Sequence, residues 1–525
     1  GNAKLSGKLA VPMMKGPPPE RVIFSAEAKV RDAALEGALP GIDITDGVVG
    51  VTVEKGALEA KGPVKINGVP VELTWRRAAG PGGKQSAVIE ATLDGEERKK
   101  IGVDLGEFLR GPMAVKADLA DLADPEGRID IEADLSKSEM QIAAISWSRP
   151  PVPKTSATFV YFNKGERGRR IEDLVIKGEG LFIRGDVSLL PKGGMKEARL
   201  SEVKLSDENR FALTMTNGES GSTIKINGDS FDARPLIRSM FGATRPGGSD
   251  DSLSKRTPLS ITVNLDRVYA HRGEILTNVS GTIRTRGSTV EAAEVTGAFL
   301  SGQPVVLRVT PDGDGREMRI SGRDAGAAMR AANLYSKIAG GQIEFFAMMD
   351  NDASSSVREG KLVIRDFEVR NEAALAELDA KGRPKKSGPR KDGLAFKRLT
   401  LPFTTDARFL RLGDSLVRGN ELGATAQGVI RKSDGAIDIT GTIIPAYGPN
   451  AALGNIPLLG DILTGGGGEG IFGLTYALGG TMNKPVFQAN PVSAIAPGIF
   501  RKLFEYTDGT PVQQQPARNA DKASP

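Results

Sequence analysis

Residues 433–443, SDGAIDITGTI, decide the fold class of this chain. Asp434 and Gly435 form a dipeptide that favours a tight hairpin turn. Ile437, Ile439 and Ile443 then fall on alternate positions, with polar residues or glycine between them. Successive side chains of a strand point to opposite faces of its sheet. The stretch therefore predicts a turn followed by a strand with one apolar face.

The same alternation recurs along the whole chain. It is found at residues 22–30, 48–53, 69–75, 88–93, 129–135, 174–176, 211–215, 261–265, 305–309 and 362–369. Hairpin dipeptides stand between such segments at Asn67-Gly68, Asn227-Gly228 and Asp312-Gly313. Consecutive hairpins with one apolar face predict an antiparallel meander, and the lack of a fixed period argues against a strict solenoid. We therefore expect a mainly β fold, a long twisted antiparallel sheet curled into an elongated hydrophobic groove, with few short helices.

Four short helices are expected. Residues 324–338 are alanine-rich and end before Gly340 and Gly341, which we interpret as a helix stop. Residues 231–240 and 372–378 predict shorter helices, and Pro497 opens a last one. The last helix carries an apolar stripe, predicted to cap the end of the sheet, made of Ile499, Phe500, Leu503 and Phe504.

Polar and glycine-rich segments predict the domain boundaries. Residues 242–257 form a linker or long loop between a β-groove segment, 1–241, and a second one, 258–506. Residues 507–525 have almost no apolar content, which is typical of a disordered tail. Residues 379–398 are rich in lysine and arginine and predict a flexible basic loop. That loop is either a solvated insertion or a contact for anionic lipid headgroups.

Composition excludes several classes of function. The 525 residues include no cysteine, which excludes disulfides, thiol catalysis and cysteine metal sites. The 70 basic and 65 acidic residues nearly balance, so nucleic-acid affinity is not indicated, and the basic loop lacks aromatic residues that would stack on bases. No window of 18 consecutive apolar residues is present, so no membrane-spanning helix is predicted.

No catalytic or cofactor site is predicted. His271 is the single histidine and lies in a segment predicted to be a hairpin turn, so its side chain is expected to be solvated. Residues 465–470 fit the spacing of a dinucleotide-binding loop, but a strand rather than a helix follows them, so a flexible loop is expected. The carboxylate pair Asp43 and Asp46 is interpreted as turn-forming, like Asp250 and Asp251. We expect no enzyme activity, no cofactor and no metal.

The apolar strand faces are the candidate binding site. The side chains that we single out are Ile129, Ile131, Leu135, Phe211, Leu213, Met215, Ile224, Ile226, Ile261, Val263, Leu265, Ile437, Ile439 and Ile443. An ordinary core would need helices to cover them, and the expected helices are too few and too short. An uncovered apolar sheet face curls on itself or binds apolar ligands. The shortage of helices to cover these apolar strand faces predicts a lipid groove.

The C-terminal part of the sequence resembles the AsmA family of bacterial envelope proteins. The resemblance lies in residues 441–447, 456–460, 469–473, 476, 490–491 and 497–498, with 324–326, 335, 340–341, 360–367 and 147–150 upstream. It implies a β-groove of the bridge-like lipid transfer type. It further implies a periplasmic location, and an inner-membrane anchor that would precede this chain in a longer protein.

On this interpretation the chain helps phospholipid to move between the inner and outer membranes, and envelope proteins are possible partners. Nothing in the sequence predicts ATP hydrolysis. A scaffold of outer-membrane assembly that acts through protein partners is the alternative. A β-solenoid enzyme acting on polysaccharide is disfavoured, because aromatic residues make up only 5% of the chain.

Overall fold

A computed structural model describes most of the chain and is mainly β. It describes residues 2–10, 23–39, 42–103, 105–106, 108–142, 145–191, 194–241, 258–287, 289–313, 315–350, 357–371, 393–406, 408–419, 422–445, 474–482 and 484–490. Over these residues strand accounts for 72% and helix for 6%. They form one open, mostly antiparallel sheet of 27 strands and a second sheet of three. The predicted fold class is therefore confirmed.

The chain divides into two units, Gly1–Phe231 and Asp232–Pro525. In the first unit each strand of the main sheet pairs antiparallel with the next one named. These strands are β1 (Asn2–Ala10), β2 (Ile23–Leu39), β3 (Ile42–Glu54), β4 (Ala57–Ile66), β5 (Val69–Arg77), β6 (Gln85–Leu93), β8 (Met113–Leu119), β9 (Arg128–Asp134), β12 (Ser156–Phe162), β13 (Arg170–Gly178), β14 (Leu181–Leu189), β15 (Met195–Ser206), β16 (Asn209–Gly218) and β17 (Gly221–Asp232).

Helix α1 (Gly95–Lys100) follows β6 and is the one α-helix described in this unit. A small sheet joins β7 (Leu109–Arg110), β10 (Glu139–Ile142) and β11 (Trp147–Arg149).

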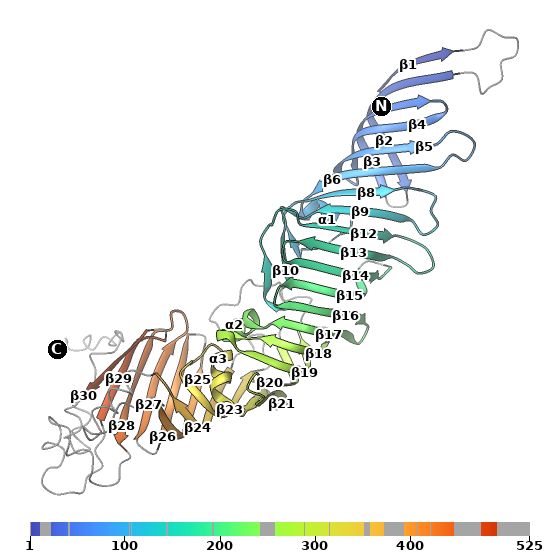
Figure 1. Ribbon diagram of the computed structural model, residues 1–525. Helices are drawn as coiled ribbons and strands as arrows, with labels where there is room; N and C mark the ends of the chain where they lie inside the picture. Colours follow the sequence, from blue (N-terminus) through green and yellow to red (C-terminus); the bar gives the residue numbers. More distant parts are fainter. Residues whose placement is uncertain are drawn as a thin grey trace, which may run out of the picture. The chain divides into compact units, whose positions relative to one another are not determined.

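The second unit is a meander of thirteen described strands, shown in yellow-green to red in Figure 1. Each pairs antiparallel with the next. They are β18 (Pro258–Tyr269), β19 (Ile275–Arg286), β20 (Thr289–Phe299), β21 (Pro304–Asp312), β22 (Gly315–Gly322), β23 (Ile338–Asp350), β24 (Val357–Val369), β25 (Leu394–Thr405), β26 (Phe409–Gly419), β27 (Leu422–Arg431), β28 (Ile437–Pro445), β29 (Leu474–Thr481) and β30 (Lys484–Asn490).

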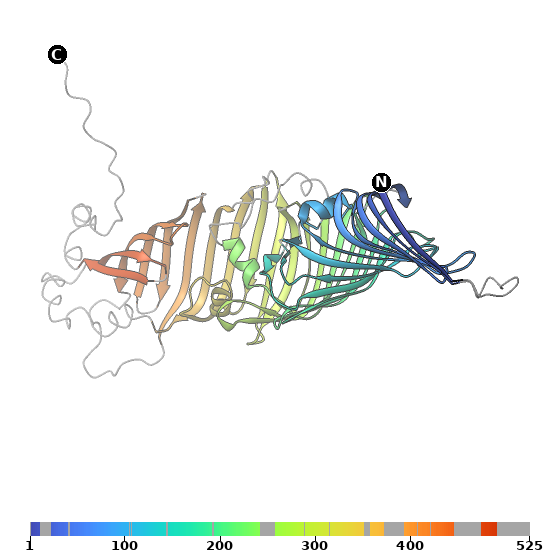
Figure 2. The same cartoon turned by 90° about the horizontal axis from the view of Figure 1, so that it is seen from above.

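The described helices of the second unit are short. They are α2 (Arg234–Phe241), the 3-10 helix η3 (His271–Gly273) and α3 (Ala325–Ala331). Figure 2 shows the strands of this unit side by side, with no described layer of helices along them.

Aspartate and asparagine residues create bulges inside the strands. Asp32, Asp46, Asp173 and Asn278 have φ between 51° and 54°, and each lies where the pairing register shifts. These side chains tolerate the left-handed region better than most others. A bulge bends its strand and increases the local twist, so it allows a long sheet to curve. Asp43 and Asp46, which we expected in a turn, therefore both lie inside β3, and the Asp46 carboxylate pairs with Lys65 at 2.8 Å.

One further turn prediction and one helix-stop prediction were wrong. Asn227 and Gly228 do not form a turn but lie inside β17, where the register with β16 shifts. A Cβ at Gly228 would lie 2.4 Å from the Cα of Phe211, so the dipeptide marks a close approach of two strands. Gly340 and Gly341 do not stop a helix either. They lie in β23 with φ of 63° and 87°.

The predicted helix 324–338 is real but shorter. Asp324 caps it by accepting a hydrogen bond from the Ala327 amide at 2.9 Å, and Ala331 is its last residue. Asn333 adopts a left-handed conformation just after it, with φ of 56°, which ends the helix in place of the glycines. The helix predicted at 231–240 begins at Arg234, because Phe231 still belongs to β17.

Several predictions lie outside the described residues. These are the linker 242–257, the helix 372–378, the glycine run 465–470, the cap residues Ile499, Phe500, Leu503 and Phe504, and the tail 507–525. Most of the basic loop 379–398 also lies outside them. Its last five residues were predicted wrongly, since Leu394–Thr405 form β25.

Candidate functional site

Pairing in the second unit aligns an apolar row across all thirteen described strands. The row consists of Ile261, Ile283, Ala293, Val309, Met318, Ala347, Gly360, Phe403, Leu412, Gly428, Ile439, Leu478 and Phe487, each paired with the next. No polar side chain interrupts it. We call it the thirteen-strand row. Alternation within single strands becomes a continuous surface because the register brings the apolar positions together.

A second apolar row runs beside the first across β18–β25. It consists of Val263, Gly281, Val295, Leu307, Ile320, Phe345, Leu362 and Leu401, and we call it the eight-strand row. Every one of these eight residues is half-buried. The row is therefore shielded by its neighbours, and among the described residues only α3 packs near it, at Leu362.

The opposite face of the same strands is polar. The residues between the two rows include Thr282, Glu294 and Arg308, all exposed. Glu294 and Arg308 form a cross-strand ion pair at 2.8 Å. The guanidinium of Arg319 lies 5.7 Å from the centre of the Phe346 ring. One face of the sheet is therefore polar and suited to contact with water, and the other face is apolar.

Helix α3 covers part of the apolar face. Its Ala325 and Met329 pack in a buried cluster with residues of β23, β24, β25 and β28, including Ile364 and Phe367. A Cβ at Gly326 would lie 2.5 Å from the Ile338 carbonyl oxygen, so the absence of a side chain lets the helix approach the sheet closely.

An ion pair holds α3 in place. Arg330 donates to Glu274 at 2.6 Å and to the Ile338 carbonyl at 3.1 Å. The helix has only seven residues, so it cannot cover thirteen strands.

Tyr476 shows how the apolar face accommodates a polar group. Its hydroxyl donates to the Thr425 carbonyl at 2.9 Å, and burial raises the pKa of Tyr476 to about 12. Its ring stacks on Phe487 with centres 5.5 Å apart. The hydroxyl is therefore satisfied by the backbone and remains protonated at neutral pH.

The first unit has apolar rows of its own. One runs through Ala91, Val115, Ala133, Ala157, Ile176, Ile183, Val203 and Phe211. Another begins at the exposed Leu5 of β1 and runs through Ala28, Val51, Ala60, Trp75, Ala87 and Leu119.

Arg98 of α1 is buried close to the first of these rows. It donates to the carbonyls of Leu93, Gly111 and Leu109 at 2.8–3.2 Å. It thus ties the helix to the loop that leads into β8.

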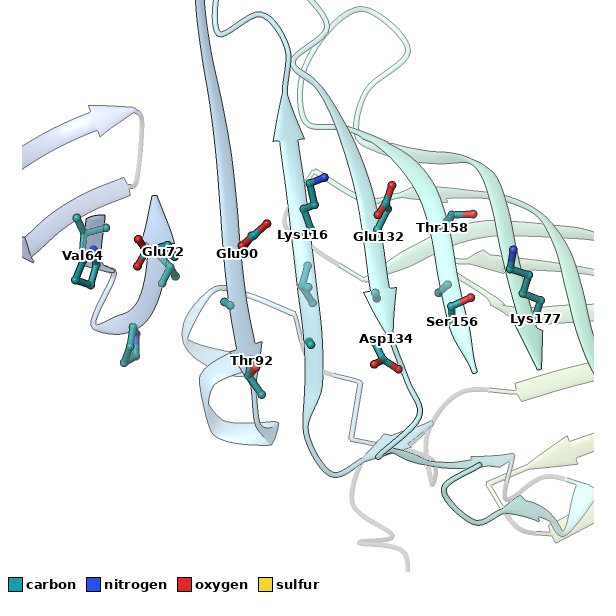
Figure 3. A pocket seen from close by; sticks show the side chains of 18 residues that line it. Val64, Glu72, Glu90, Thr92, Lys116, Glu132, Asp134, Ser156, Thr158 and Lys177 are labelled. Carbon is teal, nitrogen blue, oxygen red and sulfur yellow. The ribbon is translucent and has the colours of Figure 1, made fainter. Parts of the chain in front are cut away.

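A depression of about 790 Å³ lies in the first unit. Figure 3 shows Glu90, Lys116, Glu132 and Thr158 side by side on β6, β8, β9 and β12. Acidic and basic side chains alternate there, and the pairing puts them on the face opposite Val115. Ala91, Val115, Ala133 and Ala157 of the first apolar row also line the depression, so its lining is both apolar and charged.

The predicted groove residues fall into two groups. Half-buried ones, accessible to a ligand, are Ile129, Ile131, Leu213, Met215, Ile224, Ile226, Ile261 and Val263. Buried ones are Leu135, Phe211, Leu265, Ile437, Ile439 and Ile443. Sequence reasoning omitted most of the eight-strand row, although each member alternates within its own strand. The missing information was the register between strands.

The described residues contain no cluster of three or more histidine, aspartate or glutamate residues that could hold a metal ion. His271 lies in η3 between β18 and β19, the predicted hairpin position, and it is half-buried there. No helix in the described part of the chain has the length and apolarity needed to cross a bilayer.

Comparison with known proteins gave no relative. No family model, curated protein or solved structure matches this chain.

Proposed function

We propose that this chain binds the acyl chains of lipids on the apolar faces of its sheet and shields them from water during transfer between membranes. The observation that carries the proposal is the thirteen-strand row, with the half-buried eight-strand row beside it. An apolar sheet face with this little cover favours a ligand that is itself apolar.

The dimensions suit an acyl ligand. Neighbouring strands lie about 4.8 Å apart, so thirteen strands extend over roughly 60 Å. The length of the thirteen-strand row therefore exceeds the thickness of the hydrocarbon core of a bilayer, which is about 30 Å.

The energetics favour passive shielding. Each methylene removed from water contributes about 0.8 kcal/mol, so exposing a sixteen-carbon chain costs on the order of 10 kcal/mol. A continuous apolar face lowers this barrier without ATP, because the chain stays in contact with apolar side chains while its headgroup remains in water. The direction of movement would come from lipid gradients or from partner proteins.

The cellular setting follows from the AsmA-like sequence resemblance. On that basis the lipid is phospholipid, the compartment is the periplasm, and the two membranes are the inner and outer ones. An anchor in the inner membrane would hold one end of the longer protein.

Native mass spectrometry of the purified chain tests the proposal. Phospholipid should co-purify, and delipidated protein should regain it from vesicles or short-chain lipid. A water-soluble acyl probe should compete with the regained lipid. Protein that carries no lipid and takes none up after delipidation would refute the proposal.

A scaffold function is the second candidate, and one strand favours it. Among the described residues β30 pairs only with β29, so its other edge offers backbone groups to a partner strand. Val486 on this strand is 51% exposed. Partner proteins can add a strand to such an edge. Copurifying envelope proteins in place of lipid would support this candidate over lipid binding.

A further inference from the structure

Two cations continue the apolar face where β26 and β27 end. Arg408 lies two residues before Leu410, and Lys432 lies two residues after Ile430. Leu410 pairs with Ile430, which pairs with Ile437. Both residues lie one position beyond the ends of β26 and β27, next to the pair Leu410 and Ile430. An apolar surface therefore ends in two positive charges.

Backbone contacts hold the two cations together. The Lys432 amide donates to the Arg408 carbonyl at 2.9 Å, which extends the ladder past the last strand pair. The Lys432 ammonium donates to the Asp406 carbonyl oxygen at 2.6 Å. Burial lowers the pKa of Lys432, and the nearby Asp406 carboxylate opposes this shift only in part. An anion beside the ammonium would oppose the shift further.

The neighbouring cations on the opposite face are already paired. Arg411 binds the carboxylate of Asp406, and Arg431 binds Asp434 at 3.2 Å. Within the described part of the chain, Arg408 has no carboxylate at ion-pair distance, and its guanidinium lies 5.9 Å from the centre of the Phe409 ring.

Other strand ends of this unit differ from this one. Arg286 pairs with Glu291 at 2.6 Å, and Arg358 pairs with Asp350 at 3.2 Å. Arg316 continues the apolar rows at β22, but it is 2% exposed and donates to backbone carbonyls. Arg408 and Lys432 thus combine a position beside the apolar row, exposure, and the absence of a described carboxylate within ion-pair distance.

We propose that Arg408 and Lys432 bind the phosphate of a phospholipid whose acyl chains lie over Leu410, Ile430 and Ile437. This rests on the proposed acyl-binding function and adds a headgroup site to it. A guanidinium and an ammonium side by side match a phosphate ester, because the planar fork donates two hydrogen bonds and the ammonium acts as a point charge. Free inorganic phosphate shares this chemistry and is the other source of the ligand.

The test uses two lipids that differ only in the phosphate, short-chain phosphatidic acid and the diacylglycerol with the same chains. Both are titrated into the wild-type chain and into the double variant Arg408→Gln, Lys432→Gln. The matched control is Arg411→Gln, Arg431→Gln, which removes the same charge from the opposite face. Thermal melts of all three proteins check that they are folded.

We expect the Arg408 and Lys432 variant to bind phosphatidic acid at least about tenfold more weakly, a change of about 1.4 kcal/mol. Its diacylglycerol affinity should not change, and the control should keep wild-type affinity for both lipids. The wild-type preference for phosphatidic acid should shrink at high salt, because exposed charges are screened.

Three results would overturn parts of the argument separately. If the two double variants lose phosphatidic acid affinity equally, the site is not at Arg408 and Lys432. If inorganic phosphate binds as tightly as phosphatidic acid and displaces it, the site serves a free anion and not a lipid. If the wild-type chain binds neither lipid, the acyl-binding function itself is wrong.

Discussion

Replacing Val263 with aspartate is expected to weaken acyl binding while the sheet stays folded. Val263 is half-buried in the eight-strand row of β18, and its partner across the ladder, Gly281, has no side chain. A carboxylate at this position can therefore reach water. Its cost to folding is expected to be about 1 kcal/mol, which is the span of strand propensities.

The cost to binding should be larger. A bound acyl chain that crosses Val263 lies over about one strand spacing of 4.8 Å, which corresponds to about four methylenes. The carboxylate must stay hydrated and keeps these methylenes in water. At about 0.8 kcal/mol each, the loss is about 3.2 kcal/mol, or roughly a 200-fold weaker affinity.

The assay uses the absence of cysteine from the sequence. A single cysteine in place of Val295, the ladder partner of Gly281, carries an environment-sensitive dye that reports lipid at this part of the sheet. Lipid titrations compare Val263→Asp with Asn264→Asp. The latter adds the same charge to the next residue, on the exposed polar face. Circular dichroism melts of both proteins give the cost to folding.

One result would refute the reasoning directly. If Val263→Asp unfolds the chain as Leu265→Asp is expected to, the apolar face is a closed core. Leu265 is only 4% exposed, and an unpaired buried charge costs several kcal/mol. Equal lipid affinity of Val263→Asp and Asn264→Asp in folded proteins would show that this face does not carry the ligand.

Three further outcomes follow from packing and charge. In Gly326→Val the new Cβ would lie 2.5 Å from the Ile338 carbonyl oxygen, so α3 must move away from the sheet. We expect the free energy of unfolding in urea melts to fall by about 2 kcal/mol. Wild-type stability of this variant would show that the close approach of α3 to β23 is not needed. Arg170→Met removes a buried guanidinium that lies 3.8 Å from the Phe162 ring centre and bridges two partly exposed glutamates, so we expect a loss of about 1 kcal/mol, measured by thermal melts. Burial raises the pKa of Asp438, so its protonated form favours folding, and the benefit is lost as pH rises through the folded-state pKa. Asp438→Asn should therefore raise the melting temperature at neutral pH and have little effect in acid. An equal shift of the melting temperature at both pH values would show that burial of the ionised carboxylate is not the reason for it.

The candidate site was only partly predictable from sequence. Alternation placed Ile261, Val263 and Ile439 on apolar faces, and the structure puts all three in continuous apolar rows. It did not separate the half-buried Val263 from the buried Ile439. Burial depends on what packs above a residue, and for residues such as Ile364 that is a seven-residue helix whose place on the sheet is set by Gly326 and Arg330. Neither contact has a signal in local periodicity.

The sequence by itself determined the strands, most of their turns and the two-faced character of the sheet. These follow from local rules, since side chains alternate with a period of two and dipeptides such as Asp434-Gly435 favour tight turns. Tertiary structure alone decided the register, the bulges at residues such as Asp46 and Asn278, and the cations Arg408 and Lys432 at the end of the apolar face. The physical reason is that register and curvature depend on pairs of residues far apart in the chain, whose contacts form only when neighbouring strands meet.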